Sequence, residues 1–216
     1  MDKSAVILAG GFSKWLGSDK GLIMLAGKPL VDYVLNAVDD VVDEKIVVVS
    51  SKAQAKKFSE ALKSDAKIIV DKSEIQSPLT GASAGFSETC GRYALLLPCD
   101  IPLVLKETLT LLLEICINKS AVVPRWPDGH IEPLHAAYHI KLALDAAEKT
   151  LNAGKLDMHS MIENLNGIRY ISTLVLQQFD PELKTFFNVN TLVDLKRAEQ
   201  FLKSREIIER QRRKSL

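Results

Sequence analysis

Cysteine is scarce in this 216-residue chain. There are three, Cys90, Cys99 and Cys116, an odd number with no Cys-x-x-Cys spacing. This pattern is not that of a disulfide framework or a cysteine-ligated metal site, and it is typical of a reduced, cytoplasmic protein. We find neither a Ser/His/Asp constellation nor a cysteine placed as a nucleophile.

Long hydrophobic runs are also missing. No apolar run approaches the ~20 residues that a membrane-spanning helix needs, and Ala5–Ala9 is too short for the core of a signal peptide. There is no excess of one charge either, because 28 basic residues face 27 acidic ones, for a net charge of +1. This balance argues against binding to nucleic acid or an anionic membrane and favours a small charged ligand.

What the chain does have is ample apolar content, 47% of its residues, enough for one well-filled domain. Short β-rich runs alternate with amphipathic stretches of helical length. This predicts an α/β fold of three layers, with a mainly parallel central sheet and helices on both faces. The expected strands are Ser4–Leu8, Lys45–Val49, Lys67–Val70, Tyr93–Leu97, Ala121–Pro124 and Arg169–Ile171. The expected helices are Leu30–Asp39, Gln54–Leu62, Gly81–Cys90, Val104–Asn118, Ile140–Leu151, Met158–Leu165 and Thr191 to about Arg212.

Two local signals refine this organisation. Residues 125–138 predict a hairpin with Pro127-Asp128-Gly129 in its turn, and Thr191 with Asp194 predicts a capped start for the last helix. No linker or repeat divides the chain. We therefore expect one domain over residues 1–216.

The first expected strand ends in paired glycines, Gly10 and Gly11, and Lys20 follows nine residues later. Glycine can take backbone angles closed to other residues, so successive N–H groups can turn toward an anion, and the lysine adds positive charge. The spacing is neither that of a P-loop nor that of the dinucleotide fingerprint. It indicates a phosphate site, and the alternative is an ordinary strand-to-helix turn beside a solvated lysine.

Residues 8–20 read LAGGFSKWLGSDK, which resembles the Leu-Ala-Gly-Gly-x-Ser-x-Arg-Met-Gly-x-Asp-Lys signature of the molybdenum cofactor guanylyltransferases. Further blocks follow in the family's order over nearly the whole chain. They are Gly-Lys-Pro-Leu at 27–30, Asp71 before Ser-Pro-Leu-Thr-Gly at 77–81, Pro-Cys-Asp-Ile-Pro at 98–102, Glu-Pro-Leu at 132–134 and Asn-Val-Asn-Thr at 188–191.

This resemblance implies a nucleotide-diphospho-sugar transferase-like fold and a Mg²⁺-dependent enzyme. The reaction it implies transfers GMP from GTP to the terminal phosphate of molybdopterin and releases pyrophosphate. GTP and molybdopterin or molybdenum cofactor are then the partners, with transient contacts to cofactor-biosynthesis or acceptor enzymes, in a monomer or weak homodimer. The resemblance further implies nucleotide binding in residues 1–103 and binding of the second substrate in residues 104–216. Two other interpretations stay open: a cytidylyl- or other nucleotidyltransferase acting on a related phosphate, and a non-catalytic GTP-binding relative.

The resemblance also implies which residues bind the nucleotide, with Lys20 and Asp100 in catalytic roles. The set is Leu8, Ala9, Gly10, Gly11, Lys14, Lys20, Asp71, Gly81 and Asp100. One position departs from the signature, because Trp15 stands where the family has arginine, and tryptophan cannot pair with a phosphate. Lys14, one position earlier, supplies the charge if the loop shifts by a residue.

Asp100 follows the run Tyr93–Leu97, so it lies at the carboxyl end of an expected central strand, where open α/β sheets bind ligands. A carboxylate beside a triphosphate there suits Mg²⁺, and the alternative is a cap for the helix after Pro102. The resemblance implies Asn190 as the second metal ligand, with Asn188 as the competing choice. Either asparagine could instead stabilise a turn.

Asp71 follows the expected strand Lys67–Val70. Its carboxylate can accept two N–H bonds from a guanine edge or bond a ribose hydroxyl. Gly81 fits a tight loop in which backbone groups reach the base, or a plain helix entry. In the second half of the chain, His135 is either a packed core group or a catalytic one.

Overall fold

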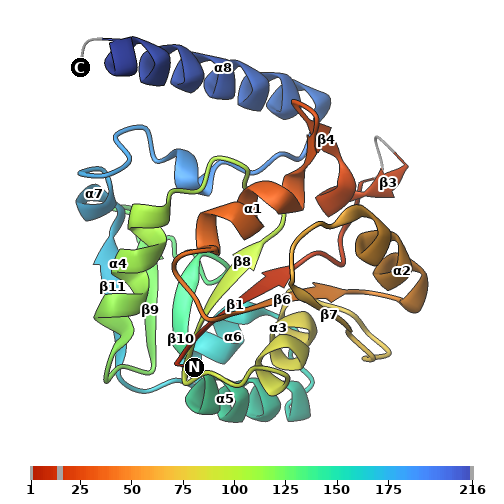
Figure 1. Ribbon diagram of the computed structural model, residues 1–216. Helices are drawn as coiled ribbons and strands as arrows, with labels where there is room; N and C mark the ends of the chain where they lie inside the picture. Colours follow the sequence, from red (N-terminus) through yellow and green to blue (C-terminus); the bar gives the residue numbers. More distant parts are fainter. Residues whose placement is uncertain (1, 14–16, 215–216) are drawn as a thin grey trace.

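A seven-stranded sheet forms the centre of the structure (Figure 1). The computed structural model describes residues 2–13 and 17–214, with the backbone alone for 205–214. Along the sheet the strand order is β11-β9-β10-β8-β1-β6-β7. Their bounds are Lys3–Leu8 (β1), Glu44–Val49 (β6), Lys67–Val70 (β7), Tyr93–Pro98 (β8), Ala121–Arg125 (β9), Ala136–His139 (β10) and Ile168–Ser172 (β11). Among the described strands of this sheet, β10 pairs antiparallel with β8 and β9 and all the other pairs are parallel, so the mainly parallel sheet is confirmed.

Helices cover both faces of the sheet. On one side lie α1 (Leu30–Val38), α2 (Lys52–Ala61) and α4 (Lys106–Cys116), and on the other α3 (Pro78–Ser87), α5 (Ile140–Asn152) and α6 (Met158–Glu163). Successive strand residues point to opposite faces. Within β1, Ala5 and Ile7 accordingly pack in the first core, while Val6 packs in the second. The predicted three-layer α/β architecture is confirmed.

Helix α3 shows the largest shift from its predicted bounds, beginning at Pro78 and not at Gly81. Ser77 caps it, because its Oγ accepts from the Thr80 N–H at 3.2 Å while Thr80 Oγ1 accepts from the Ser77 N–H at 2.8 Å. Proline at the first helical position is compatible with this start, since that N–H needs no helical partner. Gly81 therefore lies inside the first turn of a helix, so its assignment to a loop was wrong and the helix-entry alternative is confirmed.

Several short elements were not predicted. Two small hairpins follow β1, formed by β2 (Phe12–Ser13) with β3 (Ser18–Asp19) and by β4 (Met24–Leu25) with β5 (Lys28–Pro29). A short helix α7 (Thr173–Leu176) and two 3₁₀ turns, Lys20–Leu22 and Lys184–Phe186, are the other short elements of the described residues. These elements have two to four residues, too few to produce a recognisable hydrophobic period.

The predicted hairpin turn is present between β9 and β10. The Gly129 N–H donates to the Trp126 carbonyl at 2.9 Å, and Gly129 has a φ of +94°, which favours glycine. The strands themselves pair farther from the turn, with Val122 opposite Ala137. Beyond that ladder, one bridge joins Arg125 to Ile131.

Helix α8 (Leu192–Lys214) begins beside β4 and runs across the top of the molecule in Figure 1. Its predicted cap is confirmed, because the Thr191 N–H donates to Asp194 Oδ2 at 2.9 Å and the Asp194 N–H donates to Thr191 Oγ1 at 3.2 Å. Ala198 anchors its first part against Leu25 and Val189. Among the residues described, no helix combines the length and apolar character needed to cross a membrane.

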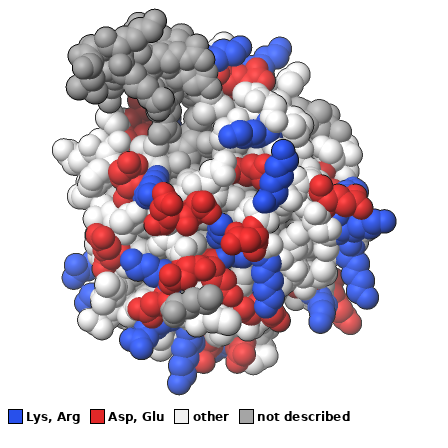
Figure 2. All heavy atoms as spheres, viewed as in Figure 1, with Lys and Arg blue, Asp and Glu red and all other residues white. Residues whose placement is uncertain are grey.

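Acidic and basic side chains are interspersed on the face drawn in Figure 2. Among the residues that the structure describes, Lys106 pairs with Asp40 at 2.7 Å and Lys45 with Asp65 at 2.7 Å. On this face neither sign dominates, in keeping with the balanced composition.

Gly85 provides a test of the packing between α3 and the sheet. A Cβ at this position would lie 2.2 Å from Val6 Cγ1, and buried β1 leaves little room to retreat. We expect Gly85→Ala to lower the free energy of unfolding by about 1–3 kcal/mol, because overpacking outweighs the better helix propensity of alanine. Urea unfolding measures this. The double variant Gly85→Ala/Val6→Ala should lose less stability than the two single variants lose in sum, because Val6→Ala removes the methyl group that the new Cβ at position 85 would meet. Strictly additive losses would contradict the packing argument.

Candidate nucleotide-binding site

A cavity of about 470 Å³ opens at the carboxyl ends of β1, β6 and β8. The chain runs from β1 to β6 on one side and returns to β8 on the other, which is the switch point where open α/β sheets bind ligands. Among the residues that line it are seven singled out from the sequence: Leu8, Gly10, Gly11, Lys20, Asp71, Gly81 and Asp100. Ala9 is fully buried between two of them. Lys14 and Trp15 lie outside the described residues.

The paired glycines differ from expectation in their conformation. Neither Gly10 nor Gly11 has a positive φ, so freedom of backbone angle is not what this loop uses. A Cβ on Gly10 would instead lie 2.4 Å from Ser50 Oγ, and the hydroxyl already donates to the Gly10 carbonyl at 2.6 Å. Position 10 therefore favours glycine, because the loop passes so close to Ser50 that a side chain there would meet its hydroxyl. The alternative of a strand-to-helix turn was also wrong, because the β2–β3 hairpin follows.

Three polar groups from distant parts of the chain meet at the mouth of the cavity. Lys20 Nζ donates to Asp100 Oδ2 at 3.1 Å and to Asn190 Oδ1 at 2.6 Å. The Val189 N–H donates to the Asp100 carbonyl at 2.9 Å, which ties the returning chain to the end of β8. Two oxygens thus converge on one cation, and an ammonium group occupies the position between them.

This arrangement fits a divalent cation. A carboxylate and an amide oxygen are hard ligands of the kind that Mg²⁺ takes, usually with phosphate oxygens and water completing the shell. Asp100 caps no helix, since α4 begins only at Lys106, so the capping alternative was wrong. The Nδ2 of Asn188 lies 3.5 Å from the Phe186 carbonyl in a local contact. Asn190, by contrast, accepts from the same Lys20 ammonium as Asp100.

Asp71 lines the opposite wall and is only 6% exposed. Its Oδ1 accepts from the Ser73 N–H at 2.9 Å and its Oδ2 from the Thr80 hydroxyl at 2.7 Å. Each carboxylate oxygen keeps lone-pair capacity for a further donor. The carboxylate therefore organises the loop before α3 and can still accept a hydrogen bond from a ligand.

Cys99 lines the cavity between two prolines that flank the Asp100 turn. Burial raises the pKa of its thiol, and the neighbouring Asp100 carboxylate raises that pKa further. Because only the thiolate is a good nucleophile, this cysteine is chemically inert here. Its role is packing, against Gly21, where a Cβ would lie 3.3 Å from the sulfur.

His135 lies in the half of the chain expected to take the second substrate. It is 3% exposed, packs its ring 5.2 Å from that of Phe186, and has no hydrogen-bond partner at either nitrogen within the described structure. Glu132 Oε2 lies 3.6 Å from Nδ1, too far for a hydrogen bond. Burial lowers the pKa of the imidazole to about 4. The core interpretation of this residue is therefore favoured over a catalytic one.

The lowered pKa of His135 predicts that the free energy of unfolding falls in acid. Between pH 6.5 and 4 the folded protein holds fewer protons on His135 than the unfolded chain, so stability falls as the pH falls through this window. The expected loss is about 2 kcal/mol at pH 5 relative to pH 8. Urea unfolding of His135→Leu at both pH values should show a loss smaller by that amount. The exposed His130→Leu serves as control and should keep the wild-type pH dependence.

Sequence reasoning missed a second set of residues around the cavity. Ser50 and Gln54 contact the carbonyls of the glycine loop, residues 9–11, and Asp19 accepts a hydrogen bond from Gln54. The amide of Gln76 donates to the Ser50 carbonyl at 2.6 Å. Asp19 was visible as the residue before Lys20. Nothing in its spacing from Gln54 indicates that the two meet, because the contact joins the β2–β3 hairpin to α2.

The geometry can be compared with known proteins. The family model described as the MobA-like NTP transferase domain matches residues 5–167. The chain belongs to the MobA-like NTP transferase family. A probable molybdenum cofactor guanylyltransferase from Methanosarcina mazei is 32% identical over 198 residues, covering 89% of this chain and 88% of the relative. A protein of the same description from Pyrococcus furiosus is 34% identical, with 91% and 96% covered.

A solved structure of a MobA-like protein has the same fold. The crystal structure of molybdopterin-guanine dinucleotide biosynthesis protein A from Archaeoglobus fulgidus superposes with a TM-score of 0.79 at 29% identity. The superposition covers 93% of this chain and 99% of the Archaeoglobus fulgidus chain. The nucleotidyltransferase fold expected from the sequence is thereby confirmed over almost the whole MobA-like chain.

Proposed function

We propose that this chain is a molybdenum cofactor guanylyltransferase, which transfers GMP from GTP to the terminal phosphate of molybdopterin and releases pyrophosphate. The observation that carries the proposal is the meeting of Lys20, Asp100 and Asn190 at the mouth of the cavity, beside Gly10 and Gly11. Family membership supports the reaction class. The relatives named for this activity support the choice of substrates.

The reaction needs charge neutralisation and positioning more than covalent participation. The backbone N–H groups of Gly10 and Gly11 and the ammonium of Lys20 would neutralise the triphosphate. Asp100 and Asn190 would hold Mg²⁺, which supplies Lewis-acid stabilisation of phosphate oxygens when bound. The attacking phosphate is already ionised near neutral pH, so no general base is required.

The two halves of the chain would bind different substrates. Residues 1–103 supply all of the cavity's described lining residues except Leu134, and residues 104–216 supply Asn190 and, we propose, the surface for molybdopterin. Asp71 and Gly81 lie on the wall where the base would bind. We place the enzyme in the cytoplasm on the strength of its unpaired cysteine pattern.

Pyrophosphate release in the presence of molybdopterin and Mg²⁺ tests the proposal, with GTP, CTP and ATP compared in parallel and the product identified by mass spectrometry. Release with GTP alone supports guanylyl transfer. Release with CTP alone would make the protein a cytidylyltransferase. If GTP binds and no nucleotide turns over, the chain is a nucleotide-binding relative without catalysis.

A further inference from the structure

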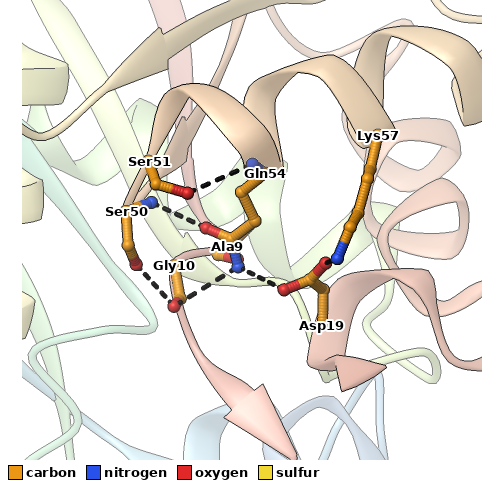
Figure 3. Close-up of polar contacts among 7 residues, drawn as sticks. All are labelled: Ala9, Gly10, Asp19, Ser50, Ser51, Gln54 and Lys57. Carbon is orange, nitrogen blue, oxygen red and sulfur yellow. Dashed lines mark hydrogen bonds and ion pairs between the residues drawn. The ribbon is translucent and has the colours of Figure 1, made fainter. Parts of the chain in front are cut away.

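A network of polar side chains contacts the Ala9 and Gly10 carbonyls of the glycine loop, residues 9–11 (Figure 3). Gln54, in the first turn of α2, is 6% exposed. Its Nε2 lies 3.4 Å from the Ala9 carbonyl oxygen and 3.5 Å from that of Gly10. Ser50 Oγ donates to the same Gly10 carbonyl at 2.6 Å. Both carbonyls therefore face α2.

These contacts determine where the N–H groups point. A trans peptide places each carbonyl and the N–H that follows it on opposite sides of the chain, and the structure has no cis peptide among its described residues. Turning the Ala9 and Gly10 carbonyls toward α2 thus turns the N–H groups of Gly10 and Gly11 away from it. Both glycines line the cavity. Within residues 2–13 and 17–214, neither N–H donates to a backbone acceptor.

Asp19 fixes the orientation of the Gln54 amide. Its Oδ1 accepts from Gln54 Nε2 at 2.8 Å, while Gln54 Oε1 accepts from the Ser50 N–H at 2.7 Å. Because the two ends of an amide differ, the nitrogen end must face Asp19 and the loop carbonyls. Lys57 pairs with Asp19 Oδ2 at 3.0 Å and compensates its charge. The negative carboxylate is thereby kept from opposing an anion in the cavity.

We propose that Gln54 is a positioning residue, which aims the Gly10 and Gly11 N–H groups at the phosphates of the bound nucleotide. The proposal deepens the proposed function and rests on it. It concerns the phosphate half of the ligand only. Affinity for GTP therefore depends on Gln54, and affinity for guanosine, which has the same base and ribose without phosphates, does not.

Gln54→Met tests this, because methionine has a similar length and no donor. Isothermal titration calorimetry with GTP and with guanosine gives the two dissociation constants, and thermal melting reports folding. We expect about a tenfold rise in the dissociation constant for GTP and less than a twofold change for guanosine. Gln178→Met is the matched control, since this exposed glutamine follows α7 at the opposite edge of the sheet. It should change neither constant.

Ser50→Ala is a milder second variant, which removes one hydroxyl and leaves Gln54 in place. It should weaken GTP binding about threefold and leave guanosine binding unchanged, and it decides the matter if Gln54→Met does not fold. Equal weakening for GTP and guanosine, or no change for either, overturns the positioning role alone when the wild-type protein binds GTP. A wild-type protein that binds guanosine and GTP equally, or neither, overturns the proposed function with it.

Discussion

Asp100→Asn is expected to lower the rate of pyrophosphate release by on the order of 10³-fold, the scale on which a single electrostatic contact to reacting phosphates acts. The substitution keeps the shape of the side chain and removes its charge. Asparagine can still accept from Lys20 Nζ, now 3.1 Å from Asp100 Oδ2, so the fold at the end of β8 should be retained. Steady-state kinetics with GTP, molybdopterin and Mg²⁺ measures the effect.

Asp40→Asn is the matched control. Asp40 is an exposed carboxylate that pairs with Lys106 at 2.7 Å, so the same chemical change there removes an ion pair far from the cavity. We expect it to leave the rate unchanged. A second measurement separates a lost metal ligand from a local distortion: Mn²⁺ binding should be lost in Asp100→Asn while the melting temperature stays near that of the wild type. A rate within threefold of the wild type would contradict a catalytic role for Asp100.

The sheet and its main helices could be predicted from the sequence because their apolar residues are nearly continuous or strongly periodic. β1 is buried along its middle and reads as an apolar run, and α1 buries Leu30, Val31, Val34 and Leu35 on one side. The start of α3 was missed although its signal was present. Ser77, Pro78 and Thr80 form a capping pattern that outweighs the helix-breaking character of Gly81.

Some residues of the candidate site could likewise be predicted from the sequence, and others could not. Lys20 and Asp100 could be predicted because each follows a recognisable block at the end of a strand. The choice between Asn188 and Asn190 could not, since it depends on which side chain faces Asp100 after the chain has crossed from β11 to α8. Gln54 and Asp19 could not be paired either, because 35 residues and a helix boundary separate them. Contacts of this kind are set by tertiary packing and leave no local pattern.

Lys20→Met is expected to change metal binding and turnover in opposite directions. The Lys20 ammonium lies between Asp100 Oδ2 and Asn190 Oδ1, at 3.1 Å and 2.6 Å. A divalent cation that binds to these oxygens must displace it. Removing the ammonium also removes like-charge repulsion, so we expect the dissociation constant for Mn²⁺ in the absence of nucleotide to fall about tenfold.

Turnover should fall in the same variant, by about 10²-fold, because the positive charge that would neutralise the triphosphate is gone. Mn²⁺ binding followed by electron paramagnetic resonance and pyrophosphate release followed by coupled assay give the two quantities on one preparation. Lys106→Met, which removes an ammonium paired with Asp40 at the surface, should alter neither. Weaker Mn²⁺ binding in Lys20→Met would mean that the lysine orders the two oxygens for the metal. Tighter binding together with slower turnover would mean that Lys20 holds the metal position until the nucleotide draws the ammonium to its phosphates, so that nucleotide binding prepares the site for the metal.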